Sequence, residues 1–250
     1  LQDEGVLMRE AEPALYIYRQ RMGDHVQTGI VAGASVDEYE ADLIKKHEHT
    51  RPVKEDDRTR HIDALNANTG PVFLTYRARA QIDRLVERLT ANRATYDFVA
   101  PDGIQHMVWV VAEPSYRDEL VQAFAGVPEL YVADGHHRSA SAANIALERK
   151  EQNPDHTGKE EYNFFLAVLF PKSQMKIMAY NRVVTDLNGL SPEEFMDRVS
   201  GSFEITQDSS PEPDGRLSYS MYLGGRWYGL VPREGSFPGD DTVKRLDASI

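Results

Sequence analysis

The sequence predicts an α+β protein with a mixed sheet, helices and additional β-hairpins. Three observations predict it: short β-rich runs joined by turn residues, amphipathic helical stretches between them, and one apolar run that breaks into a polar helix start. That run, Leu130–Asp134, stops at Gly135, and an alanine-rich stretch follows at once. Glycine accepts backbone geometry that other residues resist. We therefore expect a strand-to-helix junction at Gly135 that organises the rest of the chain.

Turn residues between β-rich runs predict three hairpins, at 14–34, 96–111 and 218–231. Their turns contain Gly23-Asp24, Pro101-Asp102-Gly103 and Gly224-Gly225. The most apolar run, Tyr162–Phe170, is predicted to be a central strand, with 177–184 as its partner. Further strands are expected at Val72–Tyr76 and Phe203–Ile205.

Helical patterns complete the predicted fold. Apolar stripes and helix-start residues predict helices at 36–46, 55–65, 80–89, 115–125 and 139–150. A further helix is expected to begin at Ser191, with Ser191 as its N-cap and Pro192 in its first turn. We expect a single domain over 1–250, with a candidate C-terminal subdomain at 186–250. Because the chain starts at Leu1 rather than Met, we also expect it to be a fragment of a longer chain.

Composition narrows the function classes. The sequence has no cysteine, which excludes disulfides, thiolate metal sites and cysteine nucleophiles. A net charge of −12 argues against nucleic acid as a partner, because nucleic-acid binding needs Lys and Arg to neutralise phosphates. No apolar run has the length of a membrane span, which is about 20 residues, and no signal-peptide pattern opens the chain. We expect a cytoplasmic protein.

Two polar clusters carry the candidate chemistry. The first contains His47, Glu48, His49 and Arg51, in a loop before Pro52. The second follows the apolar run and contains Asp134, His136, His137 and Arg138. A helix start offers unpaired N–H groups and a positive dipole end, so it favours phosphate and other anions. If the clusters meet in space, Arg138 would hold phosphate, Asp134 would hold Mg²⁺ through oxygen, and Glu48 would act as a general base.

Two other interpretations of these clusters stay open. The junction could be an ordinary strand-to-helix turn whose His and Arg side chains face water, and the charges at 45–60 could be a solvated face. Alternatively, the imidazoles could bind Zn²⁺, Mn²⁺ or Fe²⁺ for hydrolysis or oxidation, although their spacing matches no established metal motif. The imidazoles in question are His47, His49, His61, His136 and His137.

The same segments resemble the SerK-like family, long catalogued as a domain of unknown function. The resemblance rests on the Asp-Gly-His-His-Arg motif and on three supporting segments, which are Lys46–Arg51, Arg60–Pro71 and Glu161–Phe170. It implies a ParB/sulfiredoxin-like core and kinship with an archaeal kinase that phosphorylates free L-serine using ADP. Sulfiredoxin chemistry is excluded because the chain has no cysteine. ParB-like DNA partition fits poorly with the acidic balance.

The resemblance implies a nucleotide-dependent small-molecule kinase that uses ADP or ATP with Mg²⁺. It assigns nucleotide-phosphate binding to the turn and the first helical residues, namely Gly135, His136, His137, Arg138 and Ser139. The expected catalytic residues are Glu48, Asp134 and His137, with Asp134 as the metal ligand. A non-catalytic nucleotide-binding or sensing module is the alternative, and a structural or interaction protein comes third.

Overall fold

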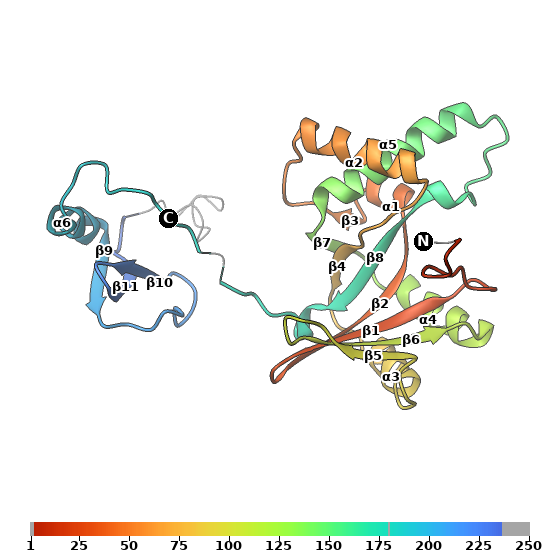
Figure 1. Ribbon diagram of the computed structural model, residues 1–250, viewed down its shortest axis with the longest axis horizontal. Helices are drawn as coiled ribbons and strands as arrows, with labels where there is room; N and C mark the ends of the chain where they lie inside the picture. The colour runs from red at the N-terminus through yellow and green to blue at the C-terminus, as the bar shows by residue number, and fades with distance from the viewer. Residues whose placement is uncertain (1–2, 180, 237–250) are drawn as a thin grey trace. The chain divides into compact units, whose positions relative to one another are not determined.

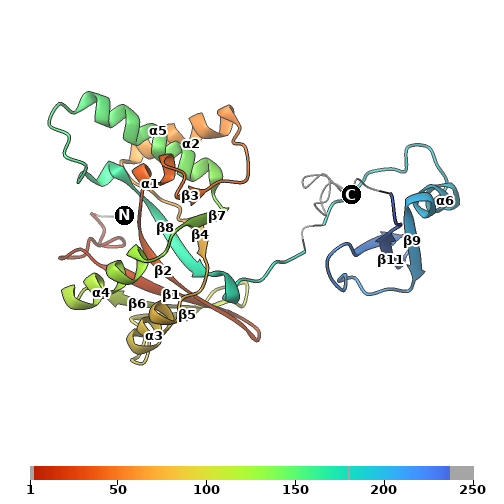
Figure 2. The same ribbon diagram turned by 180° about the vertical axis from the view of Figure 1, so that it is seen from behind.

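A computed structural model describes residues 3–179 and 181–236. The chain forms two compact units, residues 1–176 and residues 177–250. The first unit contains an eight-stranded sheet with five α-helices, and the described part of the second contains a three-stranded sheet with one helix (Figures 1 and 2). The fold is therefore α+β with a mixed sheet, as the sequence predicts.

The strands of the large sheet do not follow chain order. The sheet is ordered β3-β7-β4-β8-β2-β1-β6-β5, so β8 is central, as predicted. The neighbours β3 and β7, and β4 and β8, are parallel, and the other neighbours are antiparallel. The strands are β1 (Leu15–Met22), β2 (His25–Ser35), β3 (Ile44–Lys45), β4 (Val72–Tyr76), β5 (Tyr96–Val99), β6 (Gln105–Val111), β7 (Leu130–Asp134) and β8 (Phe164–Pro171).

Helices cover the face of this sheet that carries the core. They are α1 (Val36–Glu40), α2 (Pro52–Leu65), α3 (Ala80–Leu89), α4 (Pro114–Ala125) and α5 (His136–Gln152). In both ribbon views α2 and α5 lie side by side, and α3 and α4 lie together near β5 and β6 (Figures 1 and 2). Short 3₁₀ turns at Glu161–Asn163 and Lys172–Gln174 flank β8.

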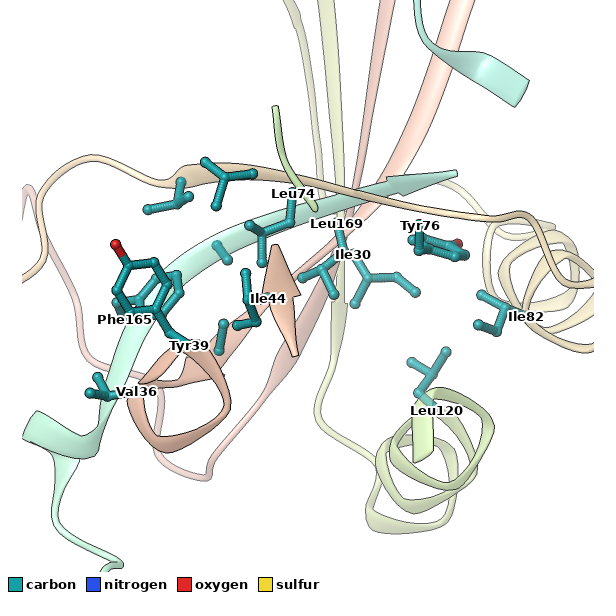
Figure 3. Packing of buried hydrophobic residues seen from close by; sticks show 14 of the residues in the cluster. Ile30, Val36, Tyr39, Ile44, Leu74, Tyr76, Ile82, Leu120, Phe165 and Leu169 are labelled. Carbon is teal, nitrogen blue, oxygen red and sulfur yellow. The ribbon is translucent and has the colours of Figure 1, made fainter. Parts of the chain in front are cut away.

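The register of the strands determines which side chains form the core. Ile17, Ile30 and Leu169 are neighbours across β1, β2 and β8, and all three side chains are buried. Figure 3 shows how α1 and the paired helices α3 and α4 contribute to the same cluster, with Tyr39 beside Phe165. Burying these apolar side chains on one face is the main favourable contribution to folding.

The second unit is a small helix-and-sheet arrangement. It contains α6 (Pro192–Ser202), β9 (Phe203–Gln207), β10 (Tyr219–Leu223) and β11 (Arg226–Pro232), with the antiparallel order β10-β11-β9. Ser191 caps α6 as predicted: its hydroxyl accepts from the Glu194 N–H at 3.2 Å, and the Glu194 carboxylate accepts from the Ser191 N–H at 2.8 Å. This reciprocal pair is a capping box.

Two predicted elements are wrong. The described residues within 177–184 form no strand, because both edges of β8 are already paired, to β2 and to β4. The helix predicted at 36–46 ends at Glu40, since Asp42 adopts a left-handed backbone with φ of 57°. The chain then re-enters the sheet as β3 beside β7. In the described ranges, no helix is both long and apolar enough to cross a membrane.

Candidate functional site

The β7–α5 junction has the geometry that its glycine predicts. Gly135 is the N-cap residue of α5, with φ of +103°, a region that side-chain-bearing residues rarely adopt. A Cβ atom at this position would lie 3.1 Å from the guanidinium of Arg138. Glycine therefore permits both the turn and the close approach of Arg138 to the backbone.

The two polar clusters meet at this junction. Loop 46–51 lies against the start of α5, where the His137 Nε2 accepts a hydrogen bond from the Arg51 N–H at 3.1 Å. The His136 Nε2 accepts a longer one from the His47 N–H, at 3.5 Å. Consecutive imidazoles thus hold both ends of the loop by accepting from its backbone, which requires an unprotonated Nε2 on each ring. We refer to this pair of contacts as the imidazole clamp.

Glu48 is brought to His136 by the same loop. The Glu48 Oε2 lies 3.6 Å from the His136 Nδ1, and the rings of His47 and His136 pack edge to face at 4.4 Å. The His136 side chain is only 4% exposed. Burial lowers the pKa of His136 and the neighbouring His47 lowers it further, against the opposing effect of Glu48. The interpretation that both histidines of the junction simply face water is therefore wrong for His136.

Two serines on the first turns of α5 are fully buried. The Ser139 hydroxyl donates to the His136 carbonyl at 3.1 Å, within its own helix. The Ser141 hydroxyl lies 2.7 Å from the His137 carbonyl in its own helix and 3.0 Å from the Glu55 carbonyl on α2, where α2 packs on α5. Ser139, which the resemblance assigns to phosphate binding, has its hydroxyl engaged inside the helix.

Arg138 connects the junction to a cavity of about 190 Å³. It forms an ion pair with Asp134, and its side chain passes 3.4 Å from where a Cβ of Gly70 would lie. Arg138 and residues from α2, the 68–70 turn, β4 and β8 line the cavity, which we call the arginine cavity; they are Arg58, His61, Ile62, Asn68, Thr69, Gly70, Val72, Phe165 and Leu166. A lining that contains two arginines, hydrogen-bonding side chains and no carboxylate suits an anion.

Sequence reasoning missed most of the polar wall of this cavity. Asn68 and Thr69 belong to a segment to which no role in the site was assigned, and Arg58 was interpreted only as part of a charged surface. The Thr69 hydroxyl lies 3.3 Å from the His61 Nε2 and connects the turn to α2. A signal was available, because the segment 60–71 carries part of the family resemblance.

Glu48 and Asp134 do not line the arginine cavity. Both carboxylates are largely exposed, at 61% and 73% of the side chain respectively. The structure thus brings Glu48 to His136 and Asp134 to Arg138, whereas the cavity beside Arg138 is built from other residues. Among the predicted site residues, Arg138 is the one that belongs to the cavity wall.

The site offers little to a metal ion acting alone. Across the described ranges, no three His, Asp or Glu side chains converge as a metal site. His136 and His137 contact different backbone groups, so they do not share an ion. Mg²⁺ commonly takes only one or two protein carboxylates and completes its shell with phosphate oxygens and water. The exposed carboxylate of Asp134 fits that limited role.

Comparison with known proteins gives a family. The family model described as "Protein of unknown function (DUF1015)" matches residues 1–249. Searches of curated proteins and of solved structures returned no match. Because the family match covers both units from end to end, this chain belongs to the DUF1015 family.

Proposed function

We propose that the protein is a nucleotide-dependent small-molecule kinase with a ParB/sulfiredoxin-like core. It would transfer the terminal phosphoryl group of ADP or ATP to a hydroxyl, with free L-serine as the first acceptor to test. One observation carries the proposal: two polar clusters far apart in sequence meet through the imidazole clamp, directly beside a cavity with an arginine wall. Phosphoryl transfer needs positioning, charge neutralisation and a base. The two arginines of the cavity support charge neutralisation, and Glu48 on the clamped loop is the candidate base.

The phosphate chain would contact the arginine cavity and the adjoining helix start. Arg138 and Arg58 supply cationic donors, and Thr69 supplies a hydroxyl. The first N–H groups of α5 and its positive dipole end favour the same charge. Mg²⁺ arriving with the nucleotide would neutralise phosphate charge, with Asp134 as its protein ligand.

Glu48 is the proposed general base. The acceptor hydroxyl oxygen would attack the terminal phosphorus, its proton would pass to the Glu48 carboxylate, and the bond from phosphorus to the bridging oxygen would break. ADP would leave as AMP, or ATP as ADP. His136 and His137 act on this step as positioning residues, because they hold the backbone of the loop that carries Glu48.

A nucleotide-binding or sensing module without turnover is the second candidate. The observation that favours it is the separation of Glu48 from the arginine cavity, whose lining does not include this carboxylate. In a sensing module, nucleotide bound beside Arg138 would order loop 46–51 without any acceptor reaching the site.

Binding and turnover distinguish these candidates. We expect calorimetry of the full chain with Mg²⁺-ADP and Mg²⁺-ATP to show binding that Arg138→Ala abolishes and Arg84→Ala, an exposed substitution on α3, leaves intact. A kinase predicts a phosphorylated product from serine or another hydroxyl amino acid, lost in Glu48→Gln while nucleotide still binds. Binding without any product would favour the sensing module, and absence of nucleotide binding would refute both candidates.

A further inference from the structure

We propose that a second cavity, beside the arginine cavity, holds the nucleoside part of the nucleotide; this inference rests on the proposed function. The second cavity is about 240 Å³ and shares Ile62 and Asn68 with the first. Its lining comes from α2, the turn that follows it, α5, the 3₁₀ turn at Glu161–Asn163 and the start of β8: Ile62, Asn66, Ala67, Asn68, Ala142, Ile145, Arg149, Glu161, Tyr162 and Phe164. The shared residues make the two cavities adjoining parts of one surface.

The lining of the second cavity suits a flat, partly polar ring. Ala142 and Ile145 on α5 are buried and form an apolar base. The ring of Phe164 lines the cavity and is 40% exposed. Tyr162 also lines it, with its ring already stacked on His156 at 5.8 Å. Base stacking on such rings contributes roughly 1–3 kcal/mol per base. Side-chain amides next to them, from Asn66 and Asn68, can hydrogen-bond to a base edge or a ribose hydroxyl.

The charges that line the second cavity balance one another, which separates it from a phosphate site: its two ionic side chains are Arg149 and Glu161. The Arg149 guanidinium donates to the Asn66 Oδ1 at 2.6 Å and to the Asp63 Oδ1 at 3.3 Å. Glu161 pairs with Arg9 at 2.7 Å. The lining of the second cavity therefore has no net charge and favours an uncharged ligand group. The lining of the arginine cavity has two arginines and no carboxylate, although Arg58 pairs with Asp57 and Arg138 with Asp134 outside the lining. The charge pattern therefore orients the nucleotide, with its phosphates beside Arg138 and its base beside Phe164.

Size supports the same arrangement. Each cavity alone is smaller than a typical small-molecule pocket, which measures roughly 300–1,000 Å³. The two together, at about 190 and about 240 Å³, fall within that range. Asn68 lies on their common border, at the position expected for the ribose.

The test compares ligands that contain different parts of the nucleotide. Calorimetry of the full chain would use ADP, inorganic pyrophosphate and adenosine on the wild type, Phe164→Ala and Ala67→Trp. Phe164→Ala removes a ring face, and Ala67→Trp places bulk at an exposed position on the cavity lining. Phe98→Ala, which truncates an exposed ring on β5, is the matched control.

We expect both cavity variants to weaken ADP binding roughly tenfold, in line with a lost stacking contact, and to leave pyrophosphate binding within about twofold of the wild type. Unchanged ADP affinity in both variants, with pyrophosphate still bound, would overturn the nucleoside site but leave the proposed function standing. Adenosine binding that Ala67→Trp removes would support the nucleoside site even if no kinase activity is found. A wild type that binds none of the three ligands would overturn both proposals.

Discussion

Acidification should release the loop that the imidazole clamp holds. The clamp depends on acceptor nitrogens in His136 and His137, and a protonated imidazole has only donors. The perturbation is a fall in pH from about 7.5 to about 5, the interval in which histidine ordinarily titrates. We compare the wild type with His136→Gln, whose side-chain carbonyl can still accept a hydrogen bond but does not titrate.

The sign and size follow from the lowered pKa of His136. The folded protein binds a proton at His136 less readily than the unfolded chain, whose histidine titrates near 6.5. The contribution of the neutral His136 ring to the free energy of unfolding is therefore present in full well above pH 6.5. It decreases as the pH drops from 6.5 towards the lower pKa of His136 in the folded protein. Over that window one histidine changes the free energy of unfolding by at most about 1.4 kcal/mol per pH unit.

The measurement uses a fluorescence probe confined to the first unit. The chain has two tryptophans, and Trp227→Phe leaves Trp109, which is buried on β6. Urea unfolding of this variant, followed by Trp109 fluorescence at each pH, gives the stability of the unit that contains His136. We expect the free energy of unfolding of His136→Gln to fall less steeply below pH 6.5 than that of the parent variant. His25→Gln, on the β1–β2 hairpin, should leave the slope unchanged. Parallel pH profiles for the wild type and His136→Gln would refute the reasoning.

Two further predictions concern local structure in the first unit. Burial alone would raise the pKa of Glu160, but hydrogen bonds from Thr157 and nearby backbone outweigh it and lower the pKa to about 2. Glu160→Gln should therefore lower the urea midpoint of unfolding at pH 7. The difference from the wild type should shrink as the pH falls below 4.5 towards about 2, and a difference that does not depend on pH would contradict this reasoning. Gly135→Ala should cost about 1–3 kcal/mol in the same assay, because φ is +103° and the new methyl group would meet Arg138. Gly126→Ala, at φ of −83° with only an ordinary contact, should change stability by less than about 1 kcal/mol, and equal effects would argue against backbone strain at Gly135.

Local sequence signals predicted the hairpins and helices well, and they failed where pairing depends on distant strands. The segment 177–184 reads as a strand because Ile177, Val183 and Val184 favour β structure. Ile177 and Val183 are instead 97% and 92% exposed. The partners of β8 come from residues about 95 and about 137 positions earlier, as the pairs Phe73–Val168 and Val31–Val168 show. No turn signal near β8 indicates which strands it pairs with.

The candidate site likewise has one part that the local sequence predicts and one part that depends on distant segments. The junction at Gly135 could be predicted, because a strand, a glycine and a helix are adjacent in the chain. The arginine cavity could not, because it forms only when α2 packs on α5 and brings Arg58 to the side of Arg138. Ser141, whose hydroxyl lies 3.0 Å from the Glu55 carbonyl at that contact, has no feature in the sequence that distinguishes it from other small helical residues.

Arg138 connects the two halves of the site, and its position determines where the proposed phosphoryl transfer would occur. Its guanidinium pairs with Asp134 at the junction and also lines the cavity beside Gly70. A terminal phosphate held by Arg138 would therefore lie at the end of the cavity that adjoins the junction. In the proposed kinase, the acceptor would then approach from the side of loop 46–51, where Glu48 lies beside His136. A planar guanidinium can contact Asp134 and a phosphate together, whereas a lysine ammonium is a single point charge. Arg138→Lys should therefore impair transfer more than it impairs nucleotide binding.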